Sequence, residues 1–571
     1  MGRSCELFLG KNSVKSKHTP SPCSIAVEEN MNVLAYAPRG ADGIIIRVET
    51  DIRRGIPGID ITGLAEGAVR EARERVRASF RNSGFDFPQD RVLINLAPAG
   101  VRKEDASLDL PIAVSVMAAA RMVSVPDNLM VLGELELSGR VRPVRGVLSA
   151  LAAGVKAGIG EFIVPVENSR EASALQGIRF FAAATLAEVV HALLVRAESG
   201  ELPWEEAGDE HANFADPDEG RAQFNAAGDF SEVQGQVRYK RALEIAAAGG
   251  HNLLVFGPPG SGKTMLARRF PSILPPLDPV EAVEVTRLHG LAGQTTGQHV
   301  SGGLITEPPF RSPHHSASVE GVLGGGRTIR PGEITLAHFG TLFLDETPEF
   351  RLPVLQSLRE PLEDRVITIV RAEGPQKLPA DFQLIMAANS CPCGRLGATL
   401  RGGAAWGQST GFVDSDFADS GCFCTGDEIR RYWRKMGSAL LDRIDIRVPV
   451  RSPGVLTPSG EGGERSEDIR RRVAAAVEIQ KKRFKDSGIR RNSRMFPGQI
   501  EKVCGLTKSA EEAFILAAAK LGLSGRACHG VLKIARTIAD LEGNDAIESI
   551  HVLEAVQHRR FGDDPYDILS I

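Results

Sequence analysis

Hydrophobic and polar positions along the chain follow two spacings. Apolar residues recur every three or four positions around Val69, Ala72, Val76 and Phe80, which predicts a helix that Gly84 can end. Short, largely apolar runs have instead the length of buried strands, at 44–48, 92–96, 251–256, 341–344, 366–370 and 382–388. The alternation of the two patterns predicts an α/β protein.

Further helices are expected in both halves of the chain. The uncharged apolar run 110–120 predicts a buried helix, and helical spacing dominates the C-terminal part, at 467–484, 509–520, 525–540 and 549–559. The first helix also carries a stripe of arginines. We expect this stripe to be a solvated face on which the arginines pair with glutamates of the same helix. The arginines are Arg70, Arg73, Arg77 and Arg81, and the glutamates are Glu66, Glu71 and Glu74.

Interruptions of these patterns predict the domain organisation. Residues 1–30 are polar and are expected to form a disordered lead, so that Met31 could be the true start. The acidic stretch 196–229 predicts a flexible linker, and a Gly-, Pro- and Ser-rich stretch predicts a hinge at 451–466. The folded parts are then 31–195, 230–450 and a helical part at 467–571.

Composition narrows the class of protein. With 571 residues, 42% hydrophobic and 25% charged, the chain is expected to be a soluble protein of several domains. The net charge of −4 does not by itself indicate nucleic acid, so any such contact must be a local patch. The longest uncharged apolar run is too short to span a bilayer, and the N-terminus has no secretory pattern. We therefore expect a cytoplasmic protein without a membrane partner.

One glycine-rich segment predicts a nucleoside triphosphate site. Residues 257–264 fit G-x-x-x-x-G-K-[ST], between a strand-like and a helix-like segment, as Gly257, Pro258, Pro259, Gly260, Ser261, Gly262, Lys263 and Thr264. The three glycines let backbone N–H groups turn towards phosphate oxygens. Lys263 is then expected to reach the β- and γ-phosphates, and the Thr264 hydroxyl to bind Mg²⁺.

Two later strands end in polar residues that would complete an ATPase site. The apolar run 341–344 is followed by Asp345, assigned to Mg²⁺, and Glu346, assigned to activation of water. The run 382–388 is followed by Asn389, which could orient the water beside the γ-phosphate. The alternative for Asn389 is a strand-end residue that makes a turn.

Together these motifs resemble an AAA+ ATPase, and more closely its magnesium-chelatase-like YifB/ComM branch. The resemblance spans nearly everything after Met31 and includes the 257–264 motif. Its other motifs are AVREARERVRASFRNSGFDFP (68–88), NLAPAGVRKEDASLDLPIA (95–113), LGELELSGRVRPVRGVL (132–148), PFRSPHHSAS (309–318), GGG (324–326), PGEITLAHFGTLFLDETPEF (331–350), LREPLEDR (358–365), LLDRIDI (440–446), LSGRA (523–527) and ARTIADLEG (535–543).

The resemblance implies a ring, most often a hexamer, with ATP and Mg²⁺ between subunits. Arg443 matches the arginine finger that reaches a neighbour's γ-phosphate, whereas the sequence alone favours an ion pair with Asp442 or Asp445. Arg526 matches the sensor arginine of a helical lid, after the plausible N-cap Ser524. Family members often carry another arginine where this chain has Gly530.

The family also implies an activity on DNA. We expect an ATP-driven hexamer that unwinds single-stranded or branched DNA, or migrates branches, in recombination during natural transformation. The alternative is a chelatase-type or protein-remodelling ATPase that acts on a partner protein.

The region 31–195 resembles the α+β fold of the Lon protease domain, which uses a Ser–Lys pair. Ser107 lies near the position of that nucleophile, but Leu148 occupies the position expected for the lysine. A serine without a neighbouring base is a poor nucleophile. We therefore expect a non-proteolytic domain in which Ser107 is a helix N-cap.

Two C-x-C pairs follow the third buried strand. Cys391, Cys393, Cys422 and Cys424 could hold Zn²⁺ and stabilise an insertion at 391–424, or could be four free thiols. His314 and His315 are adjacent and are expected to point apart in a loop rather than to bind a metal.

Two basic stretches are candidates for DNA contact. Ten Lys and Arg lie between Arg470 and Arg494, which predicts either a phosphate-binding patch or the solvated side of a helix. The β-strand-like run 366–370 is flanked by basic residues that could contact a DNA strand in the pore of a ring, namely Arg365, Arg371 and Lys377.

Overall fold

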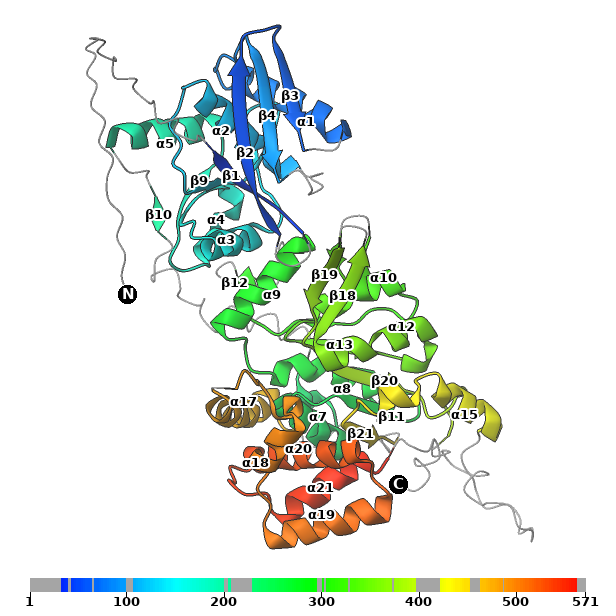
Figure 1. Ribbon diagram of the computed structural model, residues 1–571. Helices are drawn as coiled ribbons and strands as arrows, with labels where there is room; N and C mark the ends of the chain where they lie inside the picture. Colours follow the sequence, from blue (N-terminus) through cyan, green and yellow to red (C-terminus); the bar gives the residue numbers. More distant parts are fainter. Residues whose placement is uncertain are drawn as a thin grey trace, which may run out of the picture.

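The computed structural model describes residues 32–39, 43–63, 66–98, 106–199, 204–206, 228–294, 300–301, 304–326, 329–371, 374–396, 422–451, 463–485 and 487–561. The expected N-terminal lead, most of the expected linker and hinge, and residues 397–421 of the cysteine-containing insertion lie outside the described residues. Within the described part, an N-terminal unit, a central unit and a group of C-terminal helices follow one another along the molecule (Figure 1).

The N-terminal unit is built on an eight-stranded mixed sheet. Its strand order is β10-β9-β8-β5-β1-β2-β4-β3, with β1 and β2 antiparallel and β5, β8 and β9 parallel. The strands are β1 (Val33–Ala37), β2 (Ile44–Arg53), β3 (Gly58–Thr62), β4 (Arg91–Ala97), β5 (Leu129–Val131), β6 (Glu134–Leu135), β7 (Val141–Arg142), β8 (Glu161–Pro165), β9 (Arg179–Ala183) and β10 (Glu205–Glu206). The helices are α1 (Glu66–Asn82), η1 (Ala106–Leu108), α2 (Asp109–Ala119), α3 (Val147–Lys156), η2 (Val166–Asn168), α4 (Ser169–Ser173) and α5 (Leu186–Ser199).

Three expectations for this unit are corrected. Part of the expected linker, Glu205–Glu206, pairs with β9, and the ring of the preceding Trp204 lies 5.5 Å from the Arg179 guanidinium. Arg73 of the basic stripe pairs with Asp60 of the neighbouring strand β3 at 3.4 Å.

The third correction concerns Ser107, which is not a helix N-cap. It lies within the 3₁₀ turn η1, so that Leu108 occupies the position before α2, and no side chain caps this helix. The Ser107 hydroxyl is buried and has no hydrogen-bond partner among the described residues. At the position expected for a lysine, Leu148 is fully buried, and its N–H donates to Glu171 Oε1 at 3.0 Å.

The central unit contains a five-stranded parallel sheet of order β14-β17-β20-β11-β21. Its strands are β14 (Phe310–Arg311), β17 (Thr341–Leu344), β20 (Gln383–Ala388), β11 (Leu253–Phe256) and β21 (Ile446–Pro449). Smaller pairs are β12 (Val300–Ser301) with β13 (Leu304–Ile305), β15 (Gly324–Gly325) with β16 (Arg330–Pro331), and β18 (Val366–Arg371) with β19 (Gly374–Pro379).

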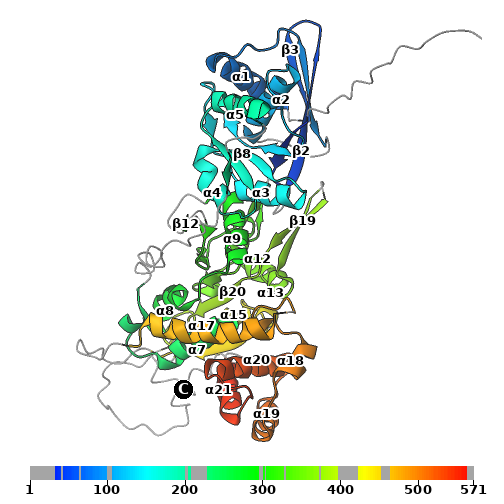
Figure 2. The ribbon, with the colours of Figure 1, turned by 90° about the vertical axis from the view of Figure 1, so that its left-hand side faces the viewer.

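The helices of the central unit lie around this sheet (Figure 1). They are η3 (Phe230–Glu232), α7 (Val237–Gly249), α8 (Lys263–Arg269), η4 (Phe270–Ile273), α9 (Pro279–Leu291), α10 (Val319–Leu323), α11 (Glu333–Leu336), η5 (Thr347–Glu349), α12 (Leu352–Ser357), α13 (Arg359–Asp364), α15 (Gly426–Arg434) and α16 (Ser438–Leu441). The hairpin β18–β19 extends away from the five-stranded sheet beside α9 (Figures 1 and 2).

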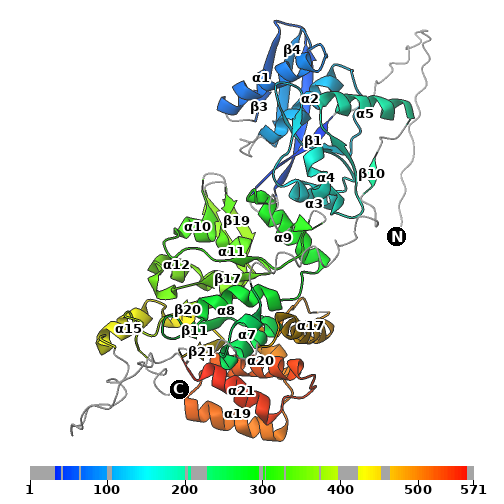
Figure 3. The same ribbon diagram turned by 180° about the vertical axis from the view of Figure 1, so that it is seen from behind.

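The C-terminal part is helical, as expected. It contains α17 (Ser466–Arg483), η6 (Asn492–Arg494), α18 (Pro497–Val503), α19 (Lys508–Leu521), α20 (Gly525–Leu541) and α21 (Ser549–Arg559). These helices gather at the end of the molecule opposite the N-terminal unit (Figure 3). No helix of the described residues combines the length and the apolar character needed to cross a bilayer.

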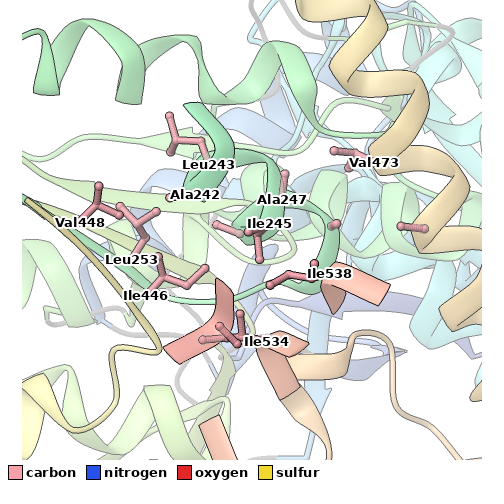
Figure 4. Close-up of a cluster of buried hydrophobic side chains, with 14 of the residues drawn as sticks. Ala242, Leu243, Ile245, Ala247, Leu253, Ile446, Val448, Val473, Ile534 and Ile538 are labelled. Atoms are coloured by element: carbon pink, nitrogen blue, oxygen red, sulfur yellow. The ribbon is translucent and has the colours of Figure 1, made fainter. Parts of the chain in front are cut away.

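One hydrophobic cluster joins the C-terminal helices to the sheet (Figure 4). Leu243 of α7, Leu253 of β11, Ile446 of β21, Val473 of α17 and Ile534 of α20 are all fully buried in it. Each such side chain contributes about 1.5–3 kcal/mol when removed from water. The shared core therefore fixes α17 and α20 against the five-stranded sheet.

Candidate nucleotide-binding and ATPase site

The predicted phosphate cradle connects strand β11, which lies between β20 and β21, to α8. Gly260 and Gly262 have φ of +72° and +84°, conformations that favour glycine, and the space beside Gly260 is open. Gly257 has a different role from the one expected, because its N–H donates to Ala388 O at 3.2 Å. A Cβ on Gly257 would lie 2.2 Å from Val450 O, so glycine is needed there for close packing against the residue that follows β21.

Lys263 is buried at the floor of the cradle. Its ammonium donates to Gly257 O and Pro258 O, both at 2.8 Å, and to Asn389 Oδ1 at 3.3 Å. Burial lowers the pKa of Lys263 to about 8, although the nearby carboxylates Asp345 and Glu346 act in the opposite direction. A triphosphate would supply the anionic partner that this buried ammonium requires.

The expected magnesium ligands converge in the structure. The Thr264 hydroxyl donates to Asp345 Oδ2 at 2.9 Å, although the two residues come from different elements. A hydroxyl and a carboxylate are the hard oxygen ligands that Mg²⁺ prefers, so both residues fit this metal. The Asp345 carboxylate also accepts the Glu346 N–H at 3.0 Å, which fixes its orientation.

Glu346 has an unusual backbone conformation. Its φ and ψ are 49° and 46°, in the left-handed region, which costs a non-glycine residue of order 1–3 kcal/mol. The Glu346 side chain is 57% exposed, so water can reach its carboxylate. His315 Nδ1 lies 3.8 Å from Glu346 Oε2.

The position of His315 corrects one expectation. The rings of His314 and His315 do not point apart but pack with their centroids 4.0 Å from each other. The His314 Nδ1 atom lies 2.8 Å from Ser316 Oγ, which holds its ring in the loop. Sequence reasoning therefore missed His315 as a neighbour of the carboxylate assigned to activate water.

All the residues discussed so far meet at the carboxyl edge of the parallel sheet. Phe256, Leu344 and Ala388 end β11, β17 and β20, and the polar residues follow directly after these ends. Ligands of open parallel sheets bind at this edge, because the strands end there together. Asn389 meets Lys263 here, so its amide faces the cradle rather than forming only a local turn.

Two residues that support the cradle were not identified from the sequence. Gln236 has φ of 52° before α7, and its amide donates to Ser261 O at 2.9 Å and to Arg451 O at 2.8 Å. The buried Tyr239 donates its hydroxyl to Lys263 O at 3.2 Å. Neither belongs to a recognisable motif, because both act through backbone carbonyls.

The lowered pKa of Lys263 predicts a pH dependence of ATP binding. Bound phosphates favour the charged ammonium, so binding is strongest below pH 8 and weakens as pH rises through that value. At pH 9 roughly one lysine in eleven remains charged, and we expect affinity about five- to tenfold lower than at pH 7.5. Titration with a fluorescent ATP analogue measures this. Lys263→Arg, which stays charged, should show a flat profile; a flat profile in the unchanged protein would contradict the prediction.

The two predicted arginines lie together at the opposite edge of the sheet. Arg443 O accepts from Asn252 Nδ2 at 3.0 Å, at the start of β11, whereas the cradle begins after its end. Five strand residues span roughly 16 Å. The Arg443 guanidinium is thus far from the Lys263 of its own chain.

A single carboxylate holds both arginines. Glu363 Oε1 lies 2.8 Å from Arg443 and 3.0 Å from Arg526, and these two guanidinium groups keep the pKa of Glu363 low although its burial acts in the opposite direction. The expected ion pair of Arg443 with Asp442 or Asp445 is therefore replaced by one with α13. Ser524 caps α20 by accepting from Ala527 N–H at 3.2 Å, as expected.

Neither expected basic patch is fully exposed in the structure. Five arginines between 470 and 494 form ion pairs within the chain: Arg471 with Asp468, Arg472 with Glu244, Arg483 with Asp540, Arg490 with Glu281 and Arg494 with Asp381. Three of these pairs, to Glu244, Glu281 and Asp381, connect the C-terminal part to the central unit. Arg365 lies half-buried at the base of the β18–β19 hairpin, whereas Arg371 and Lys377 are exposed along it.

The predicted cysteine cluster forms. Cys391, Cys393, Cys422 and Cys424 come together immediately beyond Asn389 at the same edge of the sheet. Cys391 is buried, and Cys393 is exposed.

Three families with related descriptions match this chain in order. "Subunit ChlI of Mg-chelatase" matches residues 48–168, "Magnesium chelatase, subunit ChlI" matches 229–455, and "Magnesium chelatase, subunit ChlI C-terminal" matches 463–559. The second match contains the cradle residues and Arg443, and the third contains Arg526.

Similar full-length proteins occur in bacteria. The chain is 38% identical over 527 residues to the uncharacterized protein YifB of Salmonella typhimurium, covering 92% of this chain and 96% of that protein. It is 37% identical over 533 residues to the competence protein ComM of Haemophilus influenzae, covering 92% and 97%. A weaker similarity of 30% over 145 residues, 24% of this chain and 17% of the other, is to a Lon protease of Lawsonia intracellularis.

Proposed function

This chain belongs to the YifB/ComM family of magnesium-chelatase-like AAA+ proteins, and from this premise we propose that it is an ATP-hydrolysing ring motor that acts on DNA. The observation that carries the proposal is the division of the site between two edges of one sheet. Lys263, Thr264, Asp345, Glu346 and Asn389 lie at one edge, and Arg443 and Arg526 at the other.

The residues at the carboxyl edge suffice to bind ATP and to position water. Lys263 and the amides of 260–264 hold the phosphates, while Thr264 and Asp345 would hold Mg²⁺, which supplies neutralisation of phosphate charge. Glu346 accepts a proton from the attacking water, and Asn389 orients that water beside the γ-phosphate.

The remaining charge stabilisation must come from a second copy of the chain. Arg443 lies far from its own cradle, and its partners Glu363 and Arg526, whose side chains are 45% and 51% exposed, mark a surface that a neighbour's cradle could face. Repetition of such a head-to-tail contact closes a ring, and we propose a hexamer. Glu363 then holds Arg443 and Arg526 ready for the neighbour's γ-phosphate.

The N-terminal unit is proposed to support this ring without proteolysis. Leu148 offers no base at the position where a protease would need a lysine, and the Ser107 hydroxyl is buried.

DNA is the proposed substrate, single-stranded or branched, contacted by the β18–β19 hairpin. Arg371 and Lys377 are exposed on this hairpin, and no aromatic residue of the described hairpin accompanies them. Contacts of this kind engage phosphates without a choice of sequence. Because ComM of Haemophilus influenzae is named a competence protein, we propose branch migration or unwinding during recombination of incoming DNA.

The ATPase rate with and without DNA tests this proposal. Forked and single-stranded DNA should raise the rate, and the stimulation should disappear as salt rises, because phosphate contacts release counterions. Stimulation by a partner protein and by no DNA would instead favour a chelatase-type or protein-remodelling ATPase.

A matched pair of variants locates the contact. Arg371→Ala combined with Lys377→Ala should lower DNA affinity and reduce the slope of log affinity against log salt by roughly 0.7 per lost contact to single-stranded DNA. Lys508→Ala combined with Lys520→Ala removes the same charge from α19, where both side chains are exposed, and should leave that slope unchanged. Equal effects of the two pairs would contradict a role for the hairpin.

A further inference from the structure

The four clustered cysteines have the dimensions of a metal site. All four Sγ atoms lie within 4.8 Å of one another. Cys391 Sγ is 3.4 Å from Cys393 Sγ and 3.6 Å from Cys422 Sγ, and Cys393 Sγ is 3.6 Å from Cys422 Sγ. Four sulfurs each about 2.3 Å from a tetrahedral Zn²⁺ lie about 3.8 Å from one another. Disulfide sulfurs lie only about 2.05 Å apart, so the cluster fits a metal and not a bridge.

Backbone amides surround the sulfurs as they do in metal–thiolate sites. The N–H of Leu396 donates to Cys391 Sγ at 3.4 Å, and the backbones of Arg395 and Phe423 hydrogen-bond to Cys393. Gly394, with φ of +76°, makes the turn that brings these amides round. Such amide donors orient thiolate ligands and disperse their negative charge.

The first cysteine pair is connected directly to the nucleotide site. Asn389, which contacts the Lys263 ammonium, precedes Cys391 by two residues. A Cβ on Gly394 would lie 2.9 Å from Pro259 Cδ, so the turn between the cysteines and Leu396 packs against the cradle itself. A shift of this turn would therefore move both Pro259 of the cradle and Asn389, which contacts Lys263.

The second cysteine pair leads into α15, which holds the same backbone from the other side. Thr425, directly after Cys424, caps α15 in a capping box with Glu428. The Trp433 indole of this helix donates to Ser390 O at 2.9 Å. Its ring meets Phe256, the last residue before the cradle, edge-on with centroids 5.2 Å apart.

We propose that Cys391, Cys393, Cys422 and Cys424 bind one Zn²⁺ per chain and that this zinc fixes Asn389 and Pro259 against the nucleotide. Zinc would cross-link the end of β20 to the start of α15 and so add to the contacts of Trp433 and Gly394, and its loss would loosen the 391–396 turn at the cradle. This inference rests on the nucleotide site of the proposed function and not on DNA.

Metal content and nucleotide affinity of the full chain test the two halves of the proposal. The unchanged protein, purified without chelator, should contain about one zinc per chain. Cys393→Ser alters the exposed member of the cluster and leaves no buried cavity, and it should lose the zinc. Binding of a fluorescent non-hydrolysable ATP analogue should then weaken at least tenfold. Cys528→Ser, in α20 and outside the cluster, is the matched control and should keep both zinc and affinity.

Reversible metal exchange separates positioning from misfolding. Zinc is removed from the unchanged protein with a mercurial thiol reagent and a chelator, and Zn²⁺ is then restored after the thiols are freed. Nucleotide affinity should fall and return with the metal. Substitution by Co²⁺ should give the charge-transfer and d–d absorption bands of a tetrahedral cobalt–thiolate site.

Three results would each contradict a different claim: the metal site, its effect on the nucleotide site, or the proposed function. The metal site would be contradicted by protein that binds nucleotide but contains almost no zinc and has reactive thiols at the four clustered cysteines. Zinc-free protein that binds nucleotide as tightly as zinc-loaded protein contradicts positioning. A zinc-loaded protein that binds no nucleotide contradicts the proposed function itself, and with it the coupling.

Discussion

Arg443→Ala is expected to lower ATP turnover by about 10³- to 10⁵-fold, the range found for arginine fingers. The variant should still bind ATP with nearly unchanged affinity, because Lys263 and Thr264 lie at the other edge of the sheet and stay in place. Charge that develops at the γ-phosphate would lose its guanidinium, so the loss should appear in kcat. Steady-state hydrolysis and equilibrium binding of labelled ATP measure the two quantities separately.

Mixing of variants shows whether Arg443 acts on a neighbouring chain. A Lys263→Ala subunit keeps Arg443 but has a defective cradle, and an Arg443→Ala subunit has the reverse combination. At a mixed interface of the right polarity both intact parts meet, and some hydrolysis should return once mixed rings are shown to form. Arg434→Ala, exposed at the end of α15, is the control and should hydrolyse ATP normally alone. Normal hydrolysis by assembled Arg443→Ala protein would refute the finger assignment.

Glu346→Gln is expected to bind ATP and to lower its turnover by about 10²- to 10⁴-fold, the contribution of a general base. The amide keeps the size of the side chain but cannot accept the proton of the attacking water. Lys263→Ala should differ by losing ATP binding itself, because it removes the ammonium from the floor of the cradle.

A nearby glutamate provides the comparison for Glu346→Gln. Glu349 lies three residues further on in η5, half-exposed and 4.0 Å from Lys435, so Glu349→Gln changes the same charge outside the cradle. It should alter turnover by less than about twofold, as expected for an exposed ion pair. Hydrolysis by Glu346→Gln at the unchanged rate, measured under single-turnover conditions, would show that another group activates water.

Features that depend on neighbours along the chain were predictable from the sequence. The glycine-rich turn at 257–262, the strand end before Asp345 and the helix that begins at Gly525 each follow from backbone preferences within a few residues. The same holds for the N-cap by Ser524, whose acceptor and donor are three residues apart. Local chemistry suffices wherever both partners belong to one motif.

Partners that lie far apart in the sequence were not predictable in this way. Glu363 is separated by 80 residues from Arg443 and by 163 from Arg526, and sequence reasoning gave Arg443 the nearer Asp442 or Asp445. His315 and Glu346 come from different elements that meet only at the sheet edge. The basic run at 470–494 likewise found its carboxylates on other elements, for example Asp540 for Arg483.

The sequence by itself therefore determined the three strands that end at residues 256, 344 and 388, the phosphate cradle and the polar residues that follow these strand ends. Neighbouring parallel strands end at the same edge of the sheet, so the residues that directly follow these strands lie close together there. Only the tertiary structure decided that Arg443 and Arg526 share Glu363 at the opposite edge, and that the 391–396 turn packs against Pro259 through Gly394. Those contacts depend on distances between packed elements, and hydrophobic spacing along a single chain contains no measure of such distances.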